Sequence, residues 1–204
     1  RQRQMCIRDR NTAAKEIEIA VCFDDLKICK SLPKAMAAEQ LLPLIDEILN
    51  ESKIDFDKFE YFVCVTGPGS FTGIRIGVNT VRAFAYALKK QSYGVTFNRV
   101  MSYMHSGKVM TVVDGNSGVR YIATFDGEEL MLDHACVYAK DVANYIPAGY
   151  RVVSDCETEG IESQKYVPDG EALLKAAEYA IKNKLSDEPL YIRKAQPDRK
   201  EGDI

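Results

Sequence analysis

The segment TGPGSFTGIRIG, residues 66–77, holds the residue types in this sequence that are best suited to bind an anion. It follows a hydrophobic run and precedes a long amphipathic pattern, so it is expected to join a strand to the start of a helix. Backbone N–H groups at a helix start, together with the helix dipole, can hold a phosphate or another anion. The candidate residues for a loop close to an anion or a nucleotide are Gly67, Gly69, Ser70, Thr72 and Arg75.

Neither of the two common phosphate-binding motifs is complete in this segment. A Walker motif requires a lysine after its last glycine, whereas Gly73 is followed by Ile74. The dinucleotide fingerprint G-x-G-x-x-G fails because Thr72 stands where the third glycine would be. The alternative is structural: Ser70 caps the following helix and the glycines form a tight turn. The local sequence favours this structural interpretation over anion binding.

Other side chains that could do chemistry form no recognisable motif. The two histidines, His105 and His134, are far apart in the sequence, and no Cys cluster or H-x-x-x-H spacing accompanies them. The six cysteines include no C-x-x-C pair, which favours free thiols in a reducing compartment over a disulfide framework. We therefore predict no metal site and no catalytic residue, although no local feature excludes a Cys–His pair.

Two further positions have both a functional and a structural interpretation. Asp114, in VVDGNSG, ends a predicted strand and could be a functional acid, but the Gly and Asn after it favour a turn. Tyr191 and Arg193, in PLYIR, could form a docking surface or an edge strand.

The elements that position the loop follow from hydrophobic periodicity. Alternation from residue 16 to 30 predicts a β-hairpin with Asp24 and Asp25 at its turn, and residues 59–66 read as a buried strand. Helices are predicted over residues 34–52 and 71–90. In the first helix the expected apolar stripe is Leu41, Leu42, Ile45, Ile48 and Leu49, and Pro43 must kink the helix or lie near its start.

The second helix has two adjacent stripes. Ile74, Val78, Val81, Ala85 and Leu88 form a core stripe, and small residues dominate the neighbouring one, which consists of Gly73, Gly77, Thr80, Phe84 and Ala87. A helix with two such faces is buried on both, either inside its own domain or against a partner.

The rest of the chain reads as a second set of strands with interspersed helices. Strands are expected at 93–97, 108–114, 118–127, 128–133 and 150–154, a short helix at 138–146 and an amphipathic helix at 169–184. This order predicts an α/β fold with two lobes, residues 11–98 and 99–204. Residues 1–10, RQRQMCIRDR, show neither strand nor helix periodicity, and we expect a non-native or disordered segment.

The composition is that of an ordinary globular protein. The chain has 204 residues, a net charge of −3, and 46% hydrophobic and 28% charged residues. A balance of this kind does not favour a large nucleic-acid-binding face. No run approaches the roughly 20 apolar residues that span a bilayer, so a cytoplasmic protein without a membrane partner is expected.

The chain resembles the TsaB (YeaZ-like) family. The resemblance rests on EQLLPLIDEIL (39–49), GPGSFTGIRIGVNTVRAFAYAL (67–88), VVDGNSGVRYIATFDG (112–127) and EPLYIRKA (188–195), and extends more weakly from residue 11 to 200. It implies an actin-like α/β fold of two lobes, of the sugar kinase, Hsp70 and ribonuclease H-like type.

The resemblance also implies a non-catalytic subunit. TsaB proteins pair with the larger paralogue TsaD and with the ATPase TsaE to complete threonylcarbamoyladenosine beside the anticodon of tRNA. The chain is then expected to have no cofactor of its own, with ATP or ADP and the metal on the partner subunits, and to meet tRNA through the complex. The two N-terminal helices would form the TsaD interface, through Leu41, Leu44, Ile48, Gly73, Ile76, Gly77, Thr80, Phe84 and Ala87.

Two departures from the family pattern stand out. Members open with an apolar strand ending near Asp-Thr-Ser, where this chain has MCIRDR followed by Asn11, Thr12 and Ala13. The first strand is therefore expected to be missing or replaced. A His-Ser pair common before Glu39 is Ala37-Ala38 here.

Two other functions stay open at this point. Actin-like folds include ATPases and kinases, and relatives of this family have been labelled peptidases, so an enzyme acting alone is one alternative. A homodimer that uses the same two helices in the absence of TsaD is the other.

Overall fold

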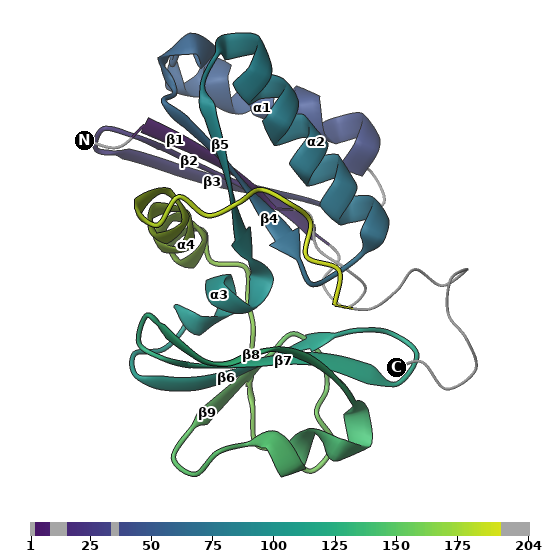
Figure 1. Ribbon diagram of the computed structural model, residues 1–204. Coiled ribbons are helices and arrows are strands. Elements are labelled where there is room, and N and C mark those ends of the chain that lie inside the picture. Colours follow the sequence, from purple (N-terminus) through teal and green to yellow (C-terminus); the bar gives the residue numbers. More distant parts are fainter. Residues whose placement is uncertain (1–2, 9–15, 34–36, 193–204) are drawn as a thin grey trace.

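The computed structural model describes residues 3–8, 16–33 and 37–192. Two five-stranded sheets, each with helices packed against it, form two lobes (Figure 1). The departures at Asn11–Ala13 and the position of Arg193 lie outside the described residues. No helix in the described part of the chain is long and apolar enough to cross a membrane.

The N-terminal sheet has the strand order β3-β2-β1-β4-β5. Its first three strands are antiparallel neighbours, whereas β1, β4 and β5 run parallel. The strands are β1 (Arg3–Arg8), β2 (Glu16–Phe23), β3 (Leu26–Pro33), β4 (Tyr61–Gly67) and β5 (Gln91–Thr96). The predicted hairpin is confirmed: Phe23 pairs with Leu26, and Asp24 has a positive φ of 51° at the turn.

Of the two alternatives for residues 1–10, non-native or disordered, disorder is wrong for residues 3–8, and the first strand, expected to be missing or replaced, is not missing. Residues 3–8 form β1, which lies centrally between β2 and β4 and pairs with both. Met5 is fully buried on the face covered by the N-terminal helices. The segment lacks a clear strand pattern of its own, but ladder partners on both sides supply the backbone hydrogen bonds that make it a strand.

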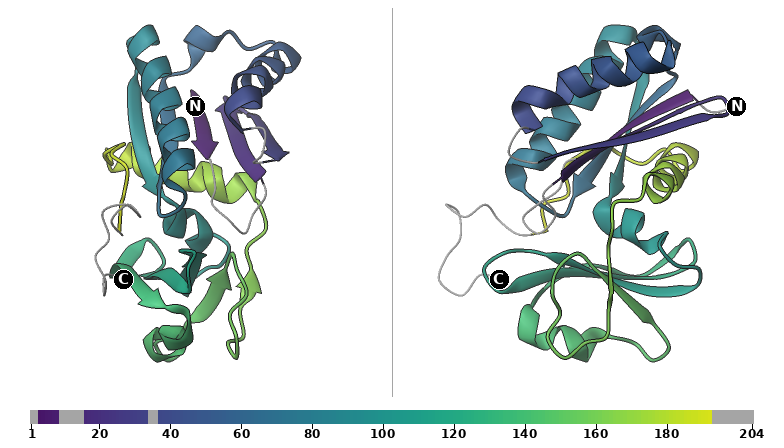
Figure 2. Two further views of the ribbon diagram at one scale, coloured as in Figure 1. Left: turned by 90° about the vertical axis from the view of Figure 1, so that its right-hand side faces the viewer. Right: turned by 180° about the vertical axis from the view of Figure 1, so that it is seen from behind.

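Helices α1 (Ala37–Ser52) and α2 (Phe71–Leu88) lie side by side over one face of this sheet (Figures 1 and 2). The predicted apolar stripe of α1 is corrected at one position: Leu42 is 57% exposed, while Leu44 is buried in its place. Successive helical residues are about 100° apart, so Leu42 points away from the face that Leu41 and Ile45 share. Pro43 lies inside α1, near its start.

The core beneath these helices is rich in phenylalanine. Phe59 and Phe62 are fully buried, and each contributes about 1.5–3 kcal/mol by leaving water. Phe56, from the short 3-10 helix η2 (Phe56–Lys58), and Phe84 of α2 extend this aromatic cluster, with ring centroids 4.7 Å apart. The N-terminal lobe therefore buries much of the inner face of α1 and α2 in its own core.

The second lobe contains a sheet with the order β10-β9-β6-β7-β8. Its strands are β6 (Lys108–Asp114), β7 (Val119–Asp126), β8 (Glu129–Tyr138), β9 (Arg151–Ser154) and β10 (Gln164–Lys165). The 3-10 helix η3 (Ala139–Tyr145) follows β8, and the short helix α3 (Phe97–Ser102) joins the lobes.

Helix α4 (Gly170–Lys182) returns to the N-terminal lobe and covers the face of its sheet opposite α1 and α2 (Figure 2). Its buried residues include Ala172, Leu173, Ala176 and Ala180, small or apolar side chains at helical spacing. The last hundred residues are therefore divided between the lobes, since the chain crosses back after its second sheet.

Candidate functional site

The glycine-rich loop joins the end of β4 to the start of α2. Gly67 has a φ of +121°, a conformation that L side chains rarely adopt. A Cβ added to it would lie 2.8 Å from the carbonyl oxygen of Leu190. This glycine is therefore required because another part of the chain passes directly against the loop.

Ser70 is the N-cap of α2. Its Oγ accepts a hydrogen bond from the backbone N–H of Gly73 at 3.3 Å, and thus satisfies one of the free donors of the first helical turn. The structural interpretation of Ser70 is confirmed by this contact. Of the other loop residues, Gly69 is half-buried and Thr72 is exposed.

The segment that passes against the loop is residues 185–192, which we call the C-terminal strap. It runs from the end of α4 toward the loop (Figure 1). The Leu190 N–H donates to the Thr66 carbonyl at 2.8 Å. The Tyr191 ring stacks on Phe71, with centroids 4.8 Å apart and planes 16° apart, and the Arg75 Nε donates to the Tyr191 hydroxyl at 3.2 Å. The strap therefore binds Arg75, the cationic side chain that an anion at the loop would need as its partner.

The strap also holds the second arginine of α2. Arg82 forms an ion pair with Asp187 at 2.7 Å, and the Ser92 hydroxyl donates to the other oxygen of that carboxylate at 2.6 Å. These contacts, Arg82 first, lower the pKa of Asp187 below its ordinary value. Gly94 of β5 lies directly beneath, where a Cβ would overlap the Ser186 carbonyl oxygen. No local pattern indicates a role for Asp187, because its partners Arg82 and Ser92 are about a hundred residues away along the chain.

The expected partner-interface residues of α1 lie in the core of their own lobe. Leu41, Leu44 and Ile48 are 3%, 6% and 0% exposed, and they pack against β-strand and α2 side chains. A side chain that is buried in the free chain has no surface to offer a partner. The prediction that these three leucine and isoleucine side chains form an interface is therefore corrected.

The residues predicted on α2 divide between core and surface. Gly73 is buried, and Phe84 is partly buried in the aromatic cluster, 5.9 Å from Phe62 between centroids. Gly77 is buried too, yet a Cβ added there would meet no atom within 4 Å beyond its immediate neighbours. The lobe's own packing therefore does not require a glycine at this position.

The outward side of α2 is poor in charge, although its two arginines are exposed. Arg75 and Arg82 are the only charged residues of the helix, and the strap engages both. We call the remaining accessible surface the uncharged face of α2; it comprises Thr72, Ile76, Asn79, Thr80, Ala83, Tyr86 and Ala87. Tyr86 is 89% exposed, the largest exposed fraction among the large apolar and aromatic side chains of the described residues. Surface helices normally present charged residues to water, so this face has the character of a contact surface.

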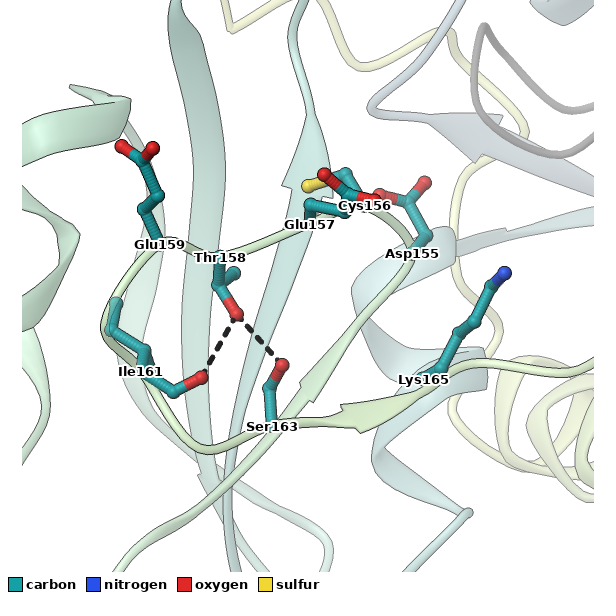
Figure 3. Close-up of a pocket in the computed structure, with 8 residues that line it drawn as sticks. All are labelled: Asp155, Cys156, Glu157, Thr158, Glu159, Ile161, Ser163 and Lys165. Carbon is teal, nitrogen blue, oxygen red and sulfur yellow. Dashed lines mark hydrogen bonds between the residues drawn. The ribbon is translucent and has the colours of Figure 1, made fainter.

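A pocket in the second lobe is lined by residues that the sequence analysis did not single out. Its wall consists of Asp155, Cys156, Glu157, Thr158, Glu159, Ile161, Ser163 and Lys165 (Figure 3). Thr158 holds the loop together through contacts with the Ile161 carbonyl at 3.3 Å and the Ser163 hydroxyl at 2.7 Å. Burial raises the pKa of Cys156 to about 11, so its thiol is protonated near neutral pH and is a weak nucleophile.

Asp114 has the turn role that the sequence favoured. Its Oδ1 accepts from the backbone N–H of Asn116 at 3.1 Å and pairs with Arg120 at 2.9 Å. Its own N–H donates to the buried carboxylate of Asp155 at 2.8 Å. This network fixes the β6–β7 turn.

The two histidines occupy different places. His105 contacts Gln164 across the β9–β10 side of the second sheet, whereas His134 lies on β8 with its Nδ1 2.8 Å from the Asp133 carboxylate. Within residues 3–8, 16–33 and 37–192, no three or more His, Cys, Asp or Glu side chains are grouped so that they could hold a metal ion.

Comparison with known proteins places this arrangement in a family. The family model described as "TsaD: tRNA N6-adenosine threonylcarbamoyltransferase" matches residues 33–181. The tRNA threonylcarbamoyladenosine biosynthesis protein TsaB of Escherichia coli is 26% identical over 160 residues, which cover 69% of this chain and 68% of that protein. A tRNA N6-adenosine threonylcarbamoyltransferase of Protochlamydia amoebophila is 32% identical over 66 residues, but the match covers 32% of this chain and 19% of that protein.

Solved structures share the fold over almost the whole chain. A Pseudomonas aeruginosa protein described as similar to peptidase YeaZ superposes with a TM-score of 0.80 at 18% identity, covering 95% of this chain and 100% of that one. YeaZ from the same organism gives a TM-score of 0.78 at 17% identity and covers 93% of this chain and 100% of its own. The predicted two-lobed, actin-like α/β fold is confirmed, and so is the resemblance to TsaB.

Proposed function

This chain belongs to the tRNA N6-adenosine threonylcarbamoyltransferase family, in which it is TsaB/YeaZ-like, and we propose that it is a non-catalytic subunit for tRNA threonylcarbamoyladenosine biosynthesis. Its role is to bind and support a TsaD-like paralogue that carries the reaction. ATP or ADP and the metal belong to the partner subunits, a TsaE-like ATPase joins the assembly, and tRNA is met through the complex. The setting is the cytoplasm.

The observation that carries this proposal is the uncharged face of α2. Apart from Arg75 and Arg82, which are exposed but engaged by the strap, the accessible surface of this 18-residue helix is uncharged and combines small, apolar and neutral polar side chains. Ala83 and Ala87 are small and exposed, so another helix could approach closely there. A paralogue with the same fold has a corresponding helix to pack against it.

The state of the glycine-rich loop supports a non-catalytic role. Ser70 is used as a helix cap, and the Arg75 guanidinium contacts Tyr191 instead of facing an open cleft. Two groups that would stabilise a phosphate, the Ser70 hydroxyl and the Arg75 guanidinium, are thus already engaged within the chain. An enzyme that acted alone at this loop would first have to displace the strap.

The experiment is reconstitution with a TsaD-type partner and tRNA, using Ala83→Arg as the test variant. Ala83 is exposed near the centre of the uncharged face, so the substitution places a desolvated charge in the interface without disturbing the core. We expect complex formation, measured by light scattering, to weaken about tenfold or more, with tRNA modification falling in parallel. Ala143→Arg, at an exposed position of η3 in the other lobe, is the matched control and should leave both unchanged.

The alternatives predict other results. Full complex formation by Ala83→Arg would overturn the assignment of this surface. A homodimer of the isolated chain that Ala83→Arg converts to monomer would show that the same face also mediates self-association. ATP hydrolysis or peptide cleavage by the chain alone, abolished by Arg75→Ala, would contradict the non-catalytic role.

A further inference from the structure

A cavity of about 360 Å³ lies between the two lobes, on the side of the strap away from α2. Its walls come from the ends of β4 and β5, from α3, β7, β8 and α4, and from the strap itself. We call it the interlobe cavity. Its lining is mostly apolar, with Phe125, Leu130 and Tyr179 among the larger side chains, and its volume is near the lower end of the roughly 300–1,000 Å³ found for ligand pockets.

Arg99 of α3 is a buried cation at the wall of this cavity. It is only 5% exposed, and its guanidinium lies between the Phe125 and Tyr179 rings, 4.4 Å from each centroid. Its Nη2 is 3.5 Å from the Tyr179 hydroxyl, while its Nη1 is buried and has no hydrogen-bond partner within the described part of the chain. Among the described residues, no carboxylate comes within ion-pair distance of it, and Glu128 acts on its charge only from farther away. Buried charges normally have a partner.

His134 of β8 presents the second unsatisfied group. Its side chain is 9% exposed, and its Nδ1 faces the Asp133 carboxylate, which can only accept, so the ring hydrogen lies on Nδ1. Burial lowers the pKa of His134, which keeps the ring neutral near pH 7. Its Nε2 therefore carries a lone pair that is buried and has no hydrogen-bond partner among the described residues, and His134 lines the same cavity.

We propose that the interlobe cavity binds a small organic monocarboxylate that carries a hydroxyl beside an apolar body. The carboxylate accepts from Arg99 Nη1, the hydroxyl donates to His134 Nε2, and the apolar body lies against Phe125, Leu130 and Tyr179, after small shifts of the Arg99 and His134 side chains expose these two enclosed atoms to the cavity. Such a ligand supplies the acceptor, the donor and the negative charge that the chain leaves missing. This inference is independent of the proposed function, because it uses neither α2 nor the loop.

The charges around the cavity favour one negative charge on the ligand over several. Arg99 is the only cationic side chain among the described residues of its lining, and Glu188 of the strap adds a carboxylate. Glu128 lies close enough to Arg99 to raise that residue's pKa against the larger effect of burial. A phosphate with two negative charges would be repelled by the carboxylates of Glu188 and Glu128, and the described lining offers it no second cation. A monocarboxylate is balanced by Arg99 alone.

The test uses the full chain and 3-phenyllactate, which has the three features in one small molecule, with binding measured by calorimetry. We expect 3-phenylpropionate, which lacks the hydroxyl, to bind about fivefold more weakly, and 3-phenylpropane-1,2-diol, which lacks the charge, at least about twentyfold more weakly. Equal binding of the three compounds, or no binding of 3-phenyllactate up to about 10 mM, would overturn the proposal.

Three variants locate the binding. Arg99→Met keeps much of the side-chain volume and should abolish the preference for 3-phenyllactate over the diol. His134→Phe keeps a ring and should abolish only the preference for 3-phenyllactate over 3-phenylpropionate. Leu130→Trp, at a 39% exposed position on the lining, should block all three compounds by filling the cavity without disturbing the buried core. Unchanged affinity in a folded Leu130→Trp protein would place the binding elsewhere.

Discussion

The glycine-rich loop and the interlobe cavity lie on two sides of the same strap, and they differ in whether their polar groups have hydrogen-bond or ion-pair partners. At the loop, Ser70, Arg75 and Arg82 all find partners within the chain. At the cavity, Arg99 and His134 each retain a buried atom without one. These polar side chains of the loop and of α2 thus have partners within the chain. The interlobe cavity, which no sequence motif marks, has polar groups that could still bind a ligand.

The difference shows that a motif and a site are separate properties. The loop has the composition of a phosphate-binding segment, but its glycines serve a tight turn and a close approach by the strap. The cavity is assembled from six elements, and no short stretch of sequence contains more than a few of its residues. The following three stability measurements test the contrast.

The largest effect is expected from Gly94→Ala. The added methyl group would overlap the Ser186 carbonyl oxygen and Thr66 and lie 2.9 Å from the Asp187 Cα, so β5 and the strap must separate. We expect a loss of about 3 kcal/mol in the free energy of unfolding, measured by urea titration. Gly77→Ala is the matched control: its methyl group meets nothing within 4 Å, and it should be neutral or stabilise the helix by up to about 1 kcal/mol. Equal effects at the two glycines would show that the strap is not held tightly.

An intermediate effect is expected from Asp187→Ala. This change leaves Arg82 and the Ser92 hydroxyl without their partner on a partly exposed surface, so we expect a loss of about 1 kcal/mol in the same titration. Asp57→Ala removes an exposed carboxylate that pairs only with the neighbouring Lys58, and it should change the stability by no more than about 0.3 kcal/mol. A strap that contributes nothing to stability would give the same result for both.

The smallest effect is expected from Arg99→Met, although Arg99 is only 5% exposed, whereas Arg75 and Arg82 are exposed. Losing two cation–π contacts weakens the folded state, but removing a buried charge strengthens it, and a methionine sulfur still packs against both rings. We expect a net change within about 1 kcal/mol of zero, read from thermal and urea unfolding. A loss of several kcal/mol would mean that Arg99 is a structural residue and would weaken the contrast with the loop.

Hydrophobic periodicity predicted most elements correctly. The β2–β3 hairpin, α2, β6, β7 and α4 lie within a few residues of their predicted ranges, because each has a complete local pattern. β1 was missed because its sequence has no such pattern, and its pairing with β2 and β4 alone makes it a strand. Leu42 was wrongly assigned to the buried face because α1 contains more apolar residues than its buried stripe can hold.

The predicted sites fared differently. The cap at Ser70 could be read from the sequence, since capping depends on residues three positions apart. The buried positions of Leu41, Leu44 and Ile48 could not, because an apolar stripe looks the same whether it meets its own sheet or a partner. The two cavity residues gave no signal beyond a lone histidine and an arginine in a short helix.

The sequence by itself determined the α/β class, the family, and the loop that starts α2, because these depend on local periodicity, capping and motif composition. Only the tertiary structure decided which face of α2 remains open, that the strap holds both of its arginines, and that Arg99 and His134 line one cavity. These properties depend on contacts between residues that are far apart in the chain, and burial is a property of the assembled molecule.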